Sequence, residues 1–171
     1  MVRPVRIVGL GGSLRAESTS RTALQAAHEF ADASYACDAM IWSSPTYQGS
    51  VSGSFKNAMD WLILLADRTP PYLSNKPIGL VSTAGGVQGL QTVNAMDFIA
   101  RSLRGWSVPL VIPVPQSWHT FDADGHLVDE AVTAQLRALG AEVARAARQF
   151  QTSGTCDYAE DRPVAADSGR P

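Results

Sequence analysis

The chain has 171 residues, of which 45% are hydrophobic and 18% are charged, as in an ordinary globular protein of one domain. A formal net charge of -2 with no basic block excludes nucleic acid and anionic membrane surfaces as expected partners, and favours small-molecule substrates. No signal-type apolar region precedes the first predicted strand, and no apolar run approaches the roughly 20 residues of a membrane helix, which favours a cytoplasmic protein.

The first predicted element is a strand that ends in a glycine-rich loop. Residues 5–8 are mostly β-branched, as in a buried parallel strand, and Gly11 and Gly12 follow before a helix predicted over 20–38. Hydroxyl groups, a guanidinium and the N–H groups of a helix start together suit an anion, above all a phosphate. The candidate side chains are Ser13, Arg15, Ser18, Thr19 and Ser20. The alternative is a solvated turn capped by one serine.

Three better-known motifs do not occur in this loop. The dinucleotide fingerprint G-x-G-x-x-G begins at Gly9 but has Leu14 at its last position. The pattern G-x-x-x-x-G-K-[ST] of nucleotide-triphosphate loops is absent from the whole sequence. A nucleophile elbow is excluded because Arg15 stands where the second glycine is required.

The second predicted strand, residues 39–43, leads into a polar loop over 44–53. A proline stiffens this loop, and its hydroxyl, aromatic and amide side chains would suit a flat heteroaromatic ligand. The candidate residues are Pro45, Thr46, Tyr47 and Gln48. The alternative is an ordinary strand-to-helix loop whose tyrosine packs on the fold.

A helix predicted over 54–66 has more apolar residues than one core contact needs, because Trp61, Ile63 and Leu64 lie outside its main stripe. Two explanations stay open: burial against a second subunit, and contact with later segments of the same chain.

The third predicted strand, residues 78–82, again ends in a glycine-rich loop. Its candidate residues are Ala84, Gly85, Gly86 and Gly89. Strands that alternate with helices form a parallel sheet, so the three loops should gather at one edge of it.

The remaining sequence predicts a helix over 90–104, a fourth strand over 108–112, and a long helix that Asp129 caps and that ends near Phe150. Pro109 places the fourth strand at an edge of the sheet. Asp122 and Asp124 indicate a turn rather than a calcium site. No metal site is predicted; Cys37 is interpreted as a buried apolar residue and Cys156 as a tail thiol.

With these loops in order, the chain resembles the NADPH-dependent FMN reductase family, a flavodoxin-like group of flavoproteins. The resemblance extends over roughly 5–150 and is carried by three motifs. They are residues 12–15 with Ser18 and 20–21, residues 44–47 continuing into 55–61, and Gly85-Gly86-x-x-Gly89. It implies a three-layer α/β fold with a doubly wound parallel sheet, and an FMN-binding domain over 1–150. We expect residues 151–171 to be a disordered tail.

The resemblance also implies the chemistry. The donors of the first loop would hold the FMN phosphate, and Pro45 to Gln48 and Ala84 to Gly89 would border the isoalloxazine ring. Hydride would pass from NADPH or NADH to flavin N5 and on to free flavin, a quinone or a similar acceptor, so no catalytic side chain is required. A homodimer or a dimer of dimers is expected.

Two other functions remain as alternatives. A flavodoxin-like electron carrier would bind FMN without nicotinamide turnover, but Arg15 and the mild net charge argue against it. A hydrolase or phosphatase of the same architecture lacks the Cys-x5-Arg motif.

The sequence departs from the family at its second strand, because the first helix leads directly to the strand at 39–43. Either this is a shortened variant, or the sequence omits a segment. A right-handed connection of this kind would move the first helix to the opposite face of the sheet and leave the last helix alone on its side. It would also expose one edge of the first strand.

Overall fold

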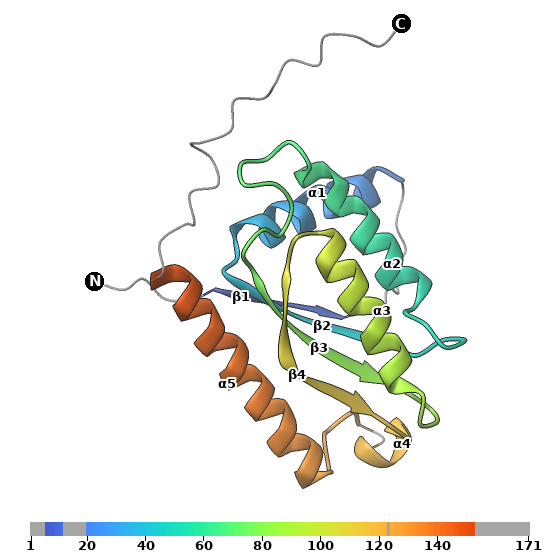
Figure 1. The fold of residues 1–171 in the computed structure, drawn as a ribbon. Coiled ribbons are helices and arrows are strands. Elements are labelled where there is room, and N and C mark those ends of the chain that lie inside the picture. The colour runs from blue at the N-terminus through green and yellow to red at the C-terminus, as the bar shows by residue number, and fades with distance from the viewer. Residues whose placement is uncertain (1–5, 12–19, 123, 153–171) are drawn as a thin grey trace, which may run out of the picture.

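The computed structural model describes residues 6–11, 20–122 and 124–152, which form one parallel sheet with helices on both faces (Figure 1). The strands lie in the order β1-β2-β3-β4, each parallel to its neighbour. They are β1 (Ile7–Gly11), β2 (Ala39–Pro45), β3 (Pro77–Thr83) and β4 (Trp106–Val114). The three-layer α/β architecture expected from the sequence is confirmed.

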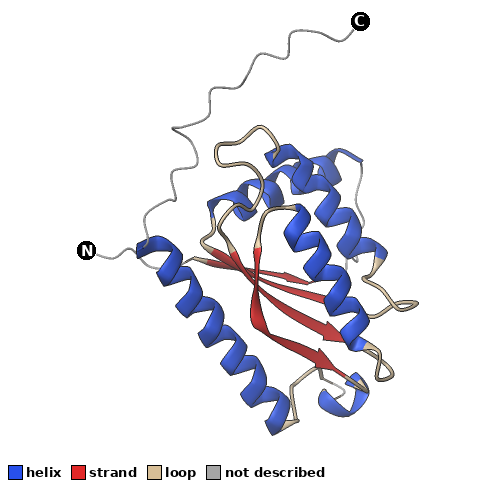
Figure 2. Cartoon of the chain, in the orientation of Figure 1, coloured by secondary structure: helices blue, strands red, loops and turns tan. Residues whose placement is uncertain are grey.

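In the described part of the chain, three helices and a 3-10 helix cover one face of the sheet, and the last described helix covers the other (Figures 1 and 2). The first group comprises α1 (Ser20–Ala36), α2 (Gly53–Asp60), η1 (Trp61–Leu65) and α3 (Gly89–Ser102). The last helix is α5 (Glu130–Thr152), and the short α4 (Ser117–Thr120) precedes it. Among the described residues, no helix has the length and apolar character of a membrane span.

Helix α1 lies on the same face of the sheet as α2 and α3, as predicted for a first helix that leads directly into the second strand. Ala31 of α1 belongs to the same buried cluster as Phe55 of α2 and Met96 of α3. Leu139 and Val143 of α5 pack in a second cluster on the other face. Because the described strands follow one another in chain order, the reversal that marks a switch point in a 2-1-3-4-5 sheet does not occur among them.

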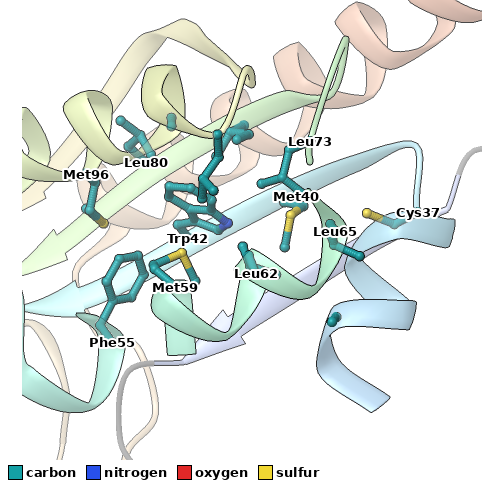
Figure 3. Close-up of a cluster of buried hydrophobic side chains, with 14 of the residues drawn as sticks. Cys37, Met40, Trp42, Phe55, Met59, Leu62, Leu65, Leu73, Leu80 and Met96 are labelled. Atoms are coloured by element: carbon teal, nitrogen blue, oxygen red, sulfur yellow. The ribbon is translucent and has the colours of Figure 1, made fainter. Parts of the chain in front are cut away.

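The larger cluster is centred on Trp42 of β2, whose side chain is fully buried (Figure 3). Its ring meets that of Phe55 edge to face, with the centroids 5.6 Å apart. Cys37 lies at the rim of this cluster, and burial raises the pKa of its thiol. Its interpretation as a buried apolar residue is thereby confirmed.

One predicted helix is divided in the structure. We expected a single helix over 54–66, whereas α2 ends at Asp60 and the tighter η1 continues to Leu65. The physical reason is the spacing of Leu62 and Leu65, both fully buried, which three residues per turn place on the same side.

Strand β4 forms an edge of the sheet, as Pro109 predicted. The pairing of β3 with β4 shifts between Ile78 and Leu80, and Pro109 lies in the segment that this shift accommodates. On β3, Gly79 lies at this register shift and lets α5 approach closely, since a β-carbon on Gly79 would lie 2.8 Å from Val143 Cγ2.

The segment before α5 contains the turn predicted from Asp122 and Asp124. The Asp122 carboxylate accepts the backbone N–H groups of Asp124 at 3.0 Å and of His126 at 2.7 Å. Asp129 caps α5 as expected, by accepting the N–H groups of residues 131 and 132. The prediction that the tail begins at residue 151 is wrong, because α5 continues to Thr152; the rest of the predicted tail, residues 153–171, lies outside the described residues.

Candidate functional site

The carboxyl ends of the strands meet at one edge of the sheet. In the register of the sheet, Gly11 at the end of β1 pairs with Ser43, and Pro45 at the end of β2 pairs with Thr83. Thr83 in turn pairs with Val114 at the end of β4. The loops that follow β2, β3 and β4 therefore leave the sheet at this edge, where β1 also ends (Figure 1).

The predicted phosphate loop lies mostly outside the described residues. Ser13, Arg15, Ser18 and Thr19 belong to the segment 12–19, of which the structure describes nothing, and Ser20 opens α1. Because β1 ends at Gly11 beside Ser43, the segment begins at the edge where the other loops gather. The assignment of these five residues to a phosphate remains a prediction.

The loop after β2 is a tight hairpin fixed to the end of β3. The Thr46 N–H donates to the Thr83 carbonyl at 2.8 Å, and Tyr47 and Ser50 exchange two backbone hydrogen bonds of 3.0 and 3.1 Å. Gln48 and Gly49 between them have φ values of 51° and 79°. Tyr47 is 62% exposed at this edge. The structure thus brings Pro45, Thr46, Tyr47 and Gln48 beside the loop after β3.

Two buried serines connect the β2 loop to α2. The Ser52 N–H donates to Ser44 Oγ at 3.0 Å, and Ser52 Oγ accepts the Phe55 N–H at 3.1 Å as the helix cap. The start of α2 is therefore fastened to the end of β2.

The loop after β3 places backbone donors at the same edge. Ala84 is buried and its N–H donates to the Val114 carbonyl at 2.9 Å, whereas Gly85 and Gly86 are exposed. Within the described residues, the N–H groups of Gly85, Gly86 and Val87 donate no hydrogen bond. They precede the first turn of α3, whose dipole favours negative charge.

Gly89 fixes the start of α3 against the sheet. Its carbonyl accepts the Ser82 hydroxyl at 2.7 Å. A β-carbon at this position would lie 2.8 Å from Ser82 Oγ and 3.1 Å from Pro113 Cβ, so only glycine fits without a shift.

Two residues at this edge were not among those predicted. Trp118 follows β4, is 58% exposed, and lies 3.2 Å from the place of a β-carbon on Gly85. Its segment is held to the β3 loop by the Ser117 N–H, which donates to the Ala84 carbonyl at 3.0 Å. Because β4 is parallel to the other strands, the loop that follows it also lies at this edge, and the sequence could have indicated Trp118 on that ground. The second residue is Thr92, a fully buried hydroxyl on α3.

The described loops at this edge contain no carboxylate, ammonium, guanidinium or thiol group and a single imidazole. Residues 45–50, 84–89 and 115–119 contain no Asp, Glu, Lys, Arg or Cys, and His119 is their single histidine. They offer backbone N–H groups, hydroxyls and two exposed aromatic rings, Tyr47 and Trp118. Such a surface suits the binding of a planar molecule better than nucleophilic or metal-dependent hydrolysis.

A family model supports this interpretation. Residues 28–119 match the model described as NADPH-dependent FMN reductase. The matched region contains the loops after β2 and β3 and ends in the loop after β4.

Curated relatives are flavin-dependent reductases by name. The chain is similar to an FMN-dependent NADPH-azoreductase of Staphylococcus haemolyticus, 29% identical over 136 residues, which are 80% of this chain and 68% of that protein. An FMN-dependent NADPH-azoreductase of Staphylococcus aureus is 35% identical over 103 residues, 60% of this chain and 52% of that one. The NADPH-dependent FMN reductase ArsH of Acidithiobacillus ferrooxidans is 29% identical over 125 residues, 73% and 52% of the two chains. The chain thus spans about half to two thirds of the length of these relatives.

Solved structures support the fold. The flavoenzyme FerB of Paracoccus denitrificans gives a TM-score of 0.57 at 18% identity, covering 86% of this chain and 98% of that one. A flavodoxin, WrbA-like protein of Agrobacterium tumefaciens gives 0.55 at 23% identity, with 85% and 97% covered. The fold is thus that of flavodoxin-like proteins.

Proposed function

Because the chain belongs to the NADPH-dependent FMN reductase family, we propose that it binds FMN and reduces it with NADPH or NADH. Electrons then pass to free flavin, a quinone or a similar acceptor. The observation that carries the proposal is the match to the family model over 28–119, the part of the chain that builds the described loops of the site. When bound, FMN supplies the atom that accepts hydride.

The residues at the edge of the sheet fit FMN. Pro45 to Gln48 and Ala84 to Gly89 border the isoalloxazine ring in this proposal, and neither stretch contains Asp, Glu, Lys or Arg. The N–H groups of residues 85–87, which donate no hydrogen bond within the described part of the chain, can bind polar atoms at the ring edge. Ser13, Arg15, Ser18, Thr19 and Ser20 hold the phosphate.

An absorbance spectrum tests this function directly. The purified protein is mixed with FMN and desalted, and its spectrum is recorded under nitrogen before and after addition of NADPH, and separately of NADH. We expect retained yellow colour that bleaches with at least one nicotinamide. Retained colour that neither nicotinamide bleaches would instead support the electron carrier. No FMN binding in an equilibrium titration would contradict the proposal.

We assign Trp118 to the acceptor side of this site. Its exposed indole packs on Gly85 in the loop that borders the ring, so it offers a stacking surface to a flat acceptor. Replacing Trp118 with alanine should lower kcat/KM for a small quinone by roughly 2- to 10-fold, the range of a lost aromatic contact. Steady-state kinetics at saturating NADPH measure the change.

Trp106 provides a matched control for the Trp118 substitution. It is also 58% exposed, but it is the first residue of β4 and so lies at the amino ends of the strands, away from the candidate site. The variant Trp106→Ala should retain the wild-type kcat/KM. Equal losses in both variants would show that Trp118 has no special contact with the acceptor.

We further propose that the protein forms a homodimer or a dimer of dimers through η1. Leu62 and Leu65 of η1 are buried in the chain's own core, whereas Ile63 is 61% and Leu64 is 37% exposed. Trp61 is only partly buried. These side chains supply an apolar surface that a second subunit can cover.

The variant Ile63→Glu should shift the protein toward the monomer. A charge buried in the subunit contact would have no partner, so the mass from multi-angle light scattering should fall by half, to one chain for a dimer and to two chains for a dimer of dimers. Val128→Glu, at a residue 56% exposed before α5, should leave the mass unchanged. A monomeric wild-type protein would exclude the dimer.

Two broader assignments complete the proposal. The FMN-binding domain comprises residues 1–150 together with the end of α5 at Thr152. The protein acts in the cytoplasm, in line with its small soluble substrates.

A further inference from the structure

The hairpin after β2 places a residue with a side chain, Gln48, in the left-handed region, whereas its glycine adopts such a φ freely. Gln48 and Gly49 both have positive φ, an arrangement that costs energy for a residue with a side chain. The hairpin contains only one residue pair, Tyr47 with Ser50, and two-residue hairpins of this length are not stable alone. Another part of the protein must therefore hold it.

Thr92 supplies this support from α3. Its side chain is fully buried, and its hydroxyl donates to Thr46 Oγ1 at 2.8 Å and to the Ser50 carbonyl at 3.1 Å, sharing one proton between them. One acceptor lies just before the hairpin and the other closes it. A single hydroxyl thus spans both ends of the turn.

Neighbouring contacts show that the turn fits closely against the same helix. A β-carbon on Gly49 would lie 2.9 Å from Gln91 Oε1, so the first turn of α3 lies against the tip of the hairpin. On its other side, the hairpin is held by the Thr46 N–H, which donates a hydrogen bond to the Thr83 carbonyl. The hairpin therefore lies between α3 and the end of β3. The Thr92 side chain connects it to α3 by hydrogen bonds.

We propose that Thr92 is a positioning residue, which holds the Thr46–Ser50 hairpin where it borders the flavin ring. The inference extends the proposed function and names a residue that acts without touching the ligand, since it is fully buried. A ligand that depends on a preformed wall loses affinity when that wall is free to move, because ordering it then takes part of the binding energy.

The test compares Thr92→Val with Thr92→Ser. Valine keeps the shape and removes the hydroxyl, whereas serine keeps the hydroxyl. The control is Thr133→Val on α5, because the Thr133 hydroxyl donates to the Asp129 carbonyl at 2.8 Å, remote from the site. Hydrogen exchange of the Tyr47 and Ser50 amides is measured without ligand, and FMN affinity is measured by fluorescence titration.

We expect Thr92→Val to speed exchange of both amides by about 10-fold and to weaken FMN binding by a similar factor, as for one lost hydrogen bond. Thr92→Ser and Thr133→Val should stay within about 2-fold of the wild type, which a general loss of stability would not produce. Unchanged exchange in Thr92→Val would overturn the inference.

The two readouts separate this inference from the proposed function. A wild-type protein that binds no FMN would refute the function. Faster exchange in Thr92→Val without weaker FMN binding would overturn the link from hairpin to flavin.

Discussion

Replacing Arg15 with alanine is expected to weaken FMN binding by about 1.5 to 3 kcal/mol, the range for hydrogen bonds to a charged group, which is roughly 10- to 150-fold in Kd. The expectation combines the residue types of the 12–19 loop with the place where β1 ends. Gly11 pairs with Ser43, so the loop starts at the edge that carries the β2 and β3 loops. Fluorescence quenching of FMN on titration measures the affinity.

Two controls show whether Arg15 acts on the phosphate. Riboflavin is FMN without its phosphate, so its affinity should change little in Arg15→Ala. Arg101→Ala removes the same charge near the end of α3, beside the amino end of β4 and away from the candidate site. Arg101 pairs with Asp97 at 2.8 Å there, and the variant should bind FMN like the wild type. An unchanged FMN affinity in Arg15→Ala would remove this residue from the site.

Replacing Trp42 with alanine should lower the free energy of unfolding by about 3 to 5 kcal/mol. The side chain is fully buried between β2 and the helices of the larger cluster, and it contacts Phe55 edge to face (Figure 3). Its loss leaves a cavity whose walls belong to several elements and cannot all close in. Urea denaturation followed by far-ultraviolet circular dichroism measures the change.

Trp42→Phe separates the loss of volume from the loss of the ring. Trp42 Nε1 is buried and has no hydrogen-bond partner among the described residues, so phenylalanine removes a donor that is not satisfied. It also keeps an aromatic ring against Phe55. We therefore expect a loss about half that of Trp42→Ala. Equal losses in the two variants would contradict this account of the core.

The gathering of the loops could be predicted because it follows from parallel strands. Three glycine-bearing loops after three apolar runs imply one edge, and the bond from the Thr46 N–H to the Thr83 carbonyl confirms that two of them meet. The side of α1 could also be predicted, since right-handed connections leave no other choice once the second strand is missing. Both predictions depend on the backbone alone.

The residues that escaped prediction depend on side-chain packing across elements. Thr92 lies on the inner side of α3 among apolar residues, and its sequence position does not show that its hydroxyl meets Thr46. Trp118 stands in a loop without the glycines that singled out the others, yet it packs on Gly85. The division of one helix into α2 and η1 likewise reflects the burial of Leu62 and Leu65.

The strand order also bears on how the chain folds during synthesis. Each strand pairs with the one made just before it, so β1, β2 and β3 can assemble in turn as they leave the ribosome, without waiting for a distant partner. One surface is different. Ala39, Val81 and Ile112 face α5, the last described element of the chain. Until α5 has been translated, this apolar surface is open to chaperones and to other nascent chains, and the final helix protects the sheet as well as completing it.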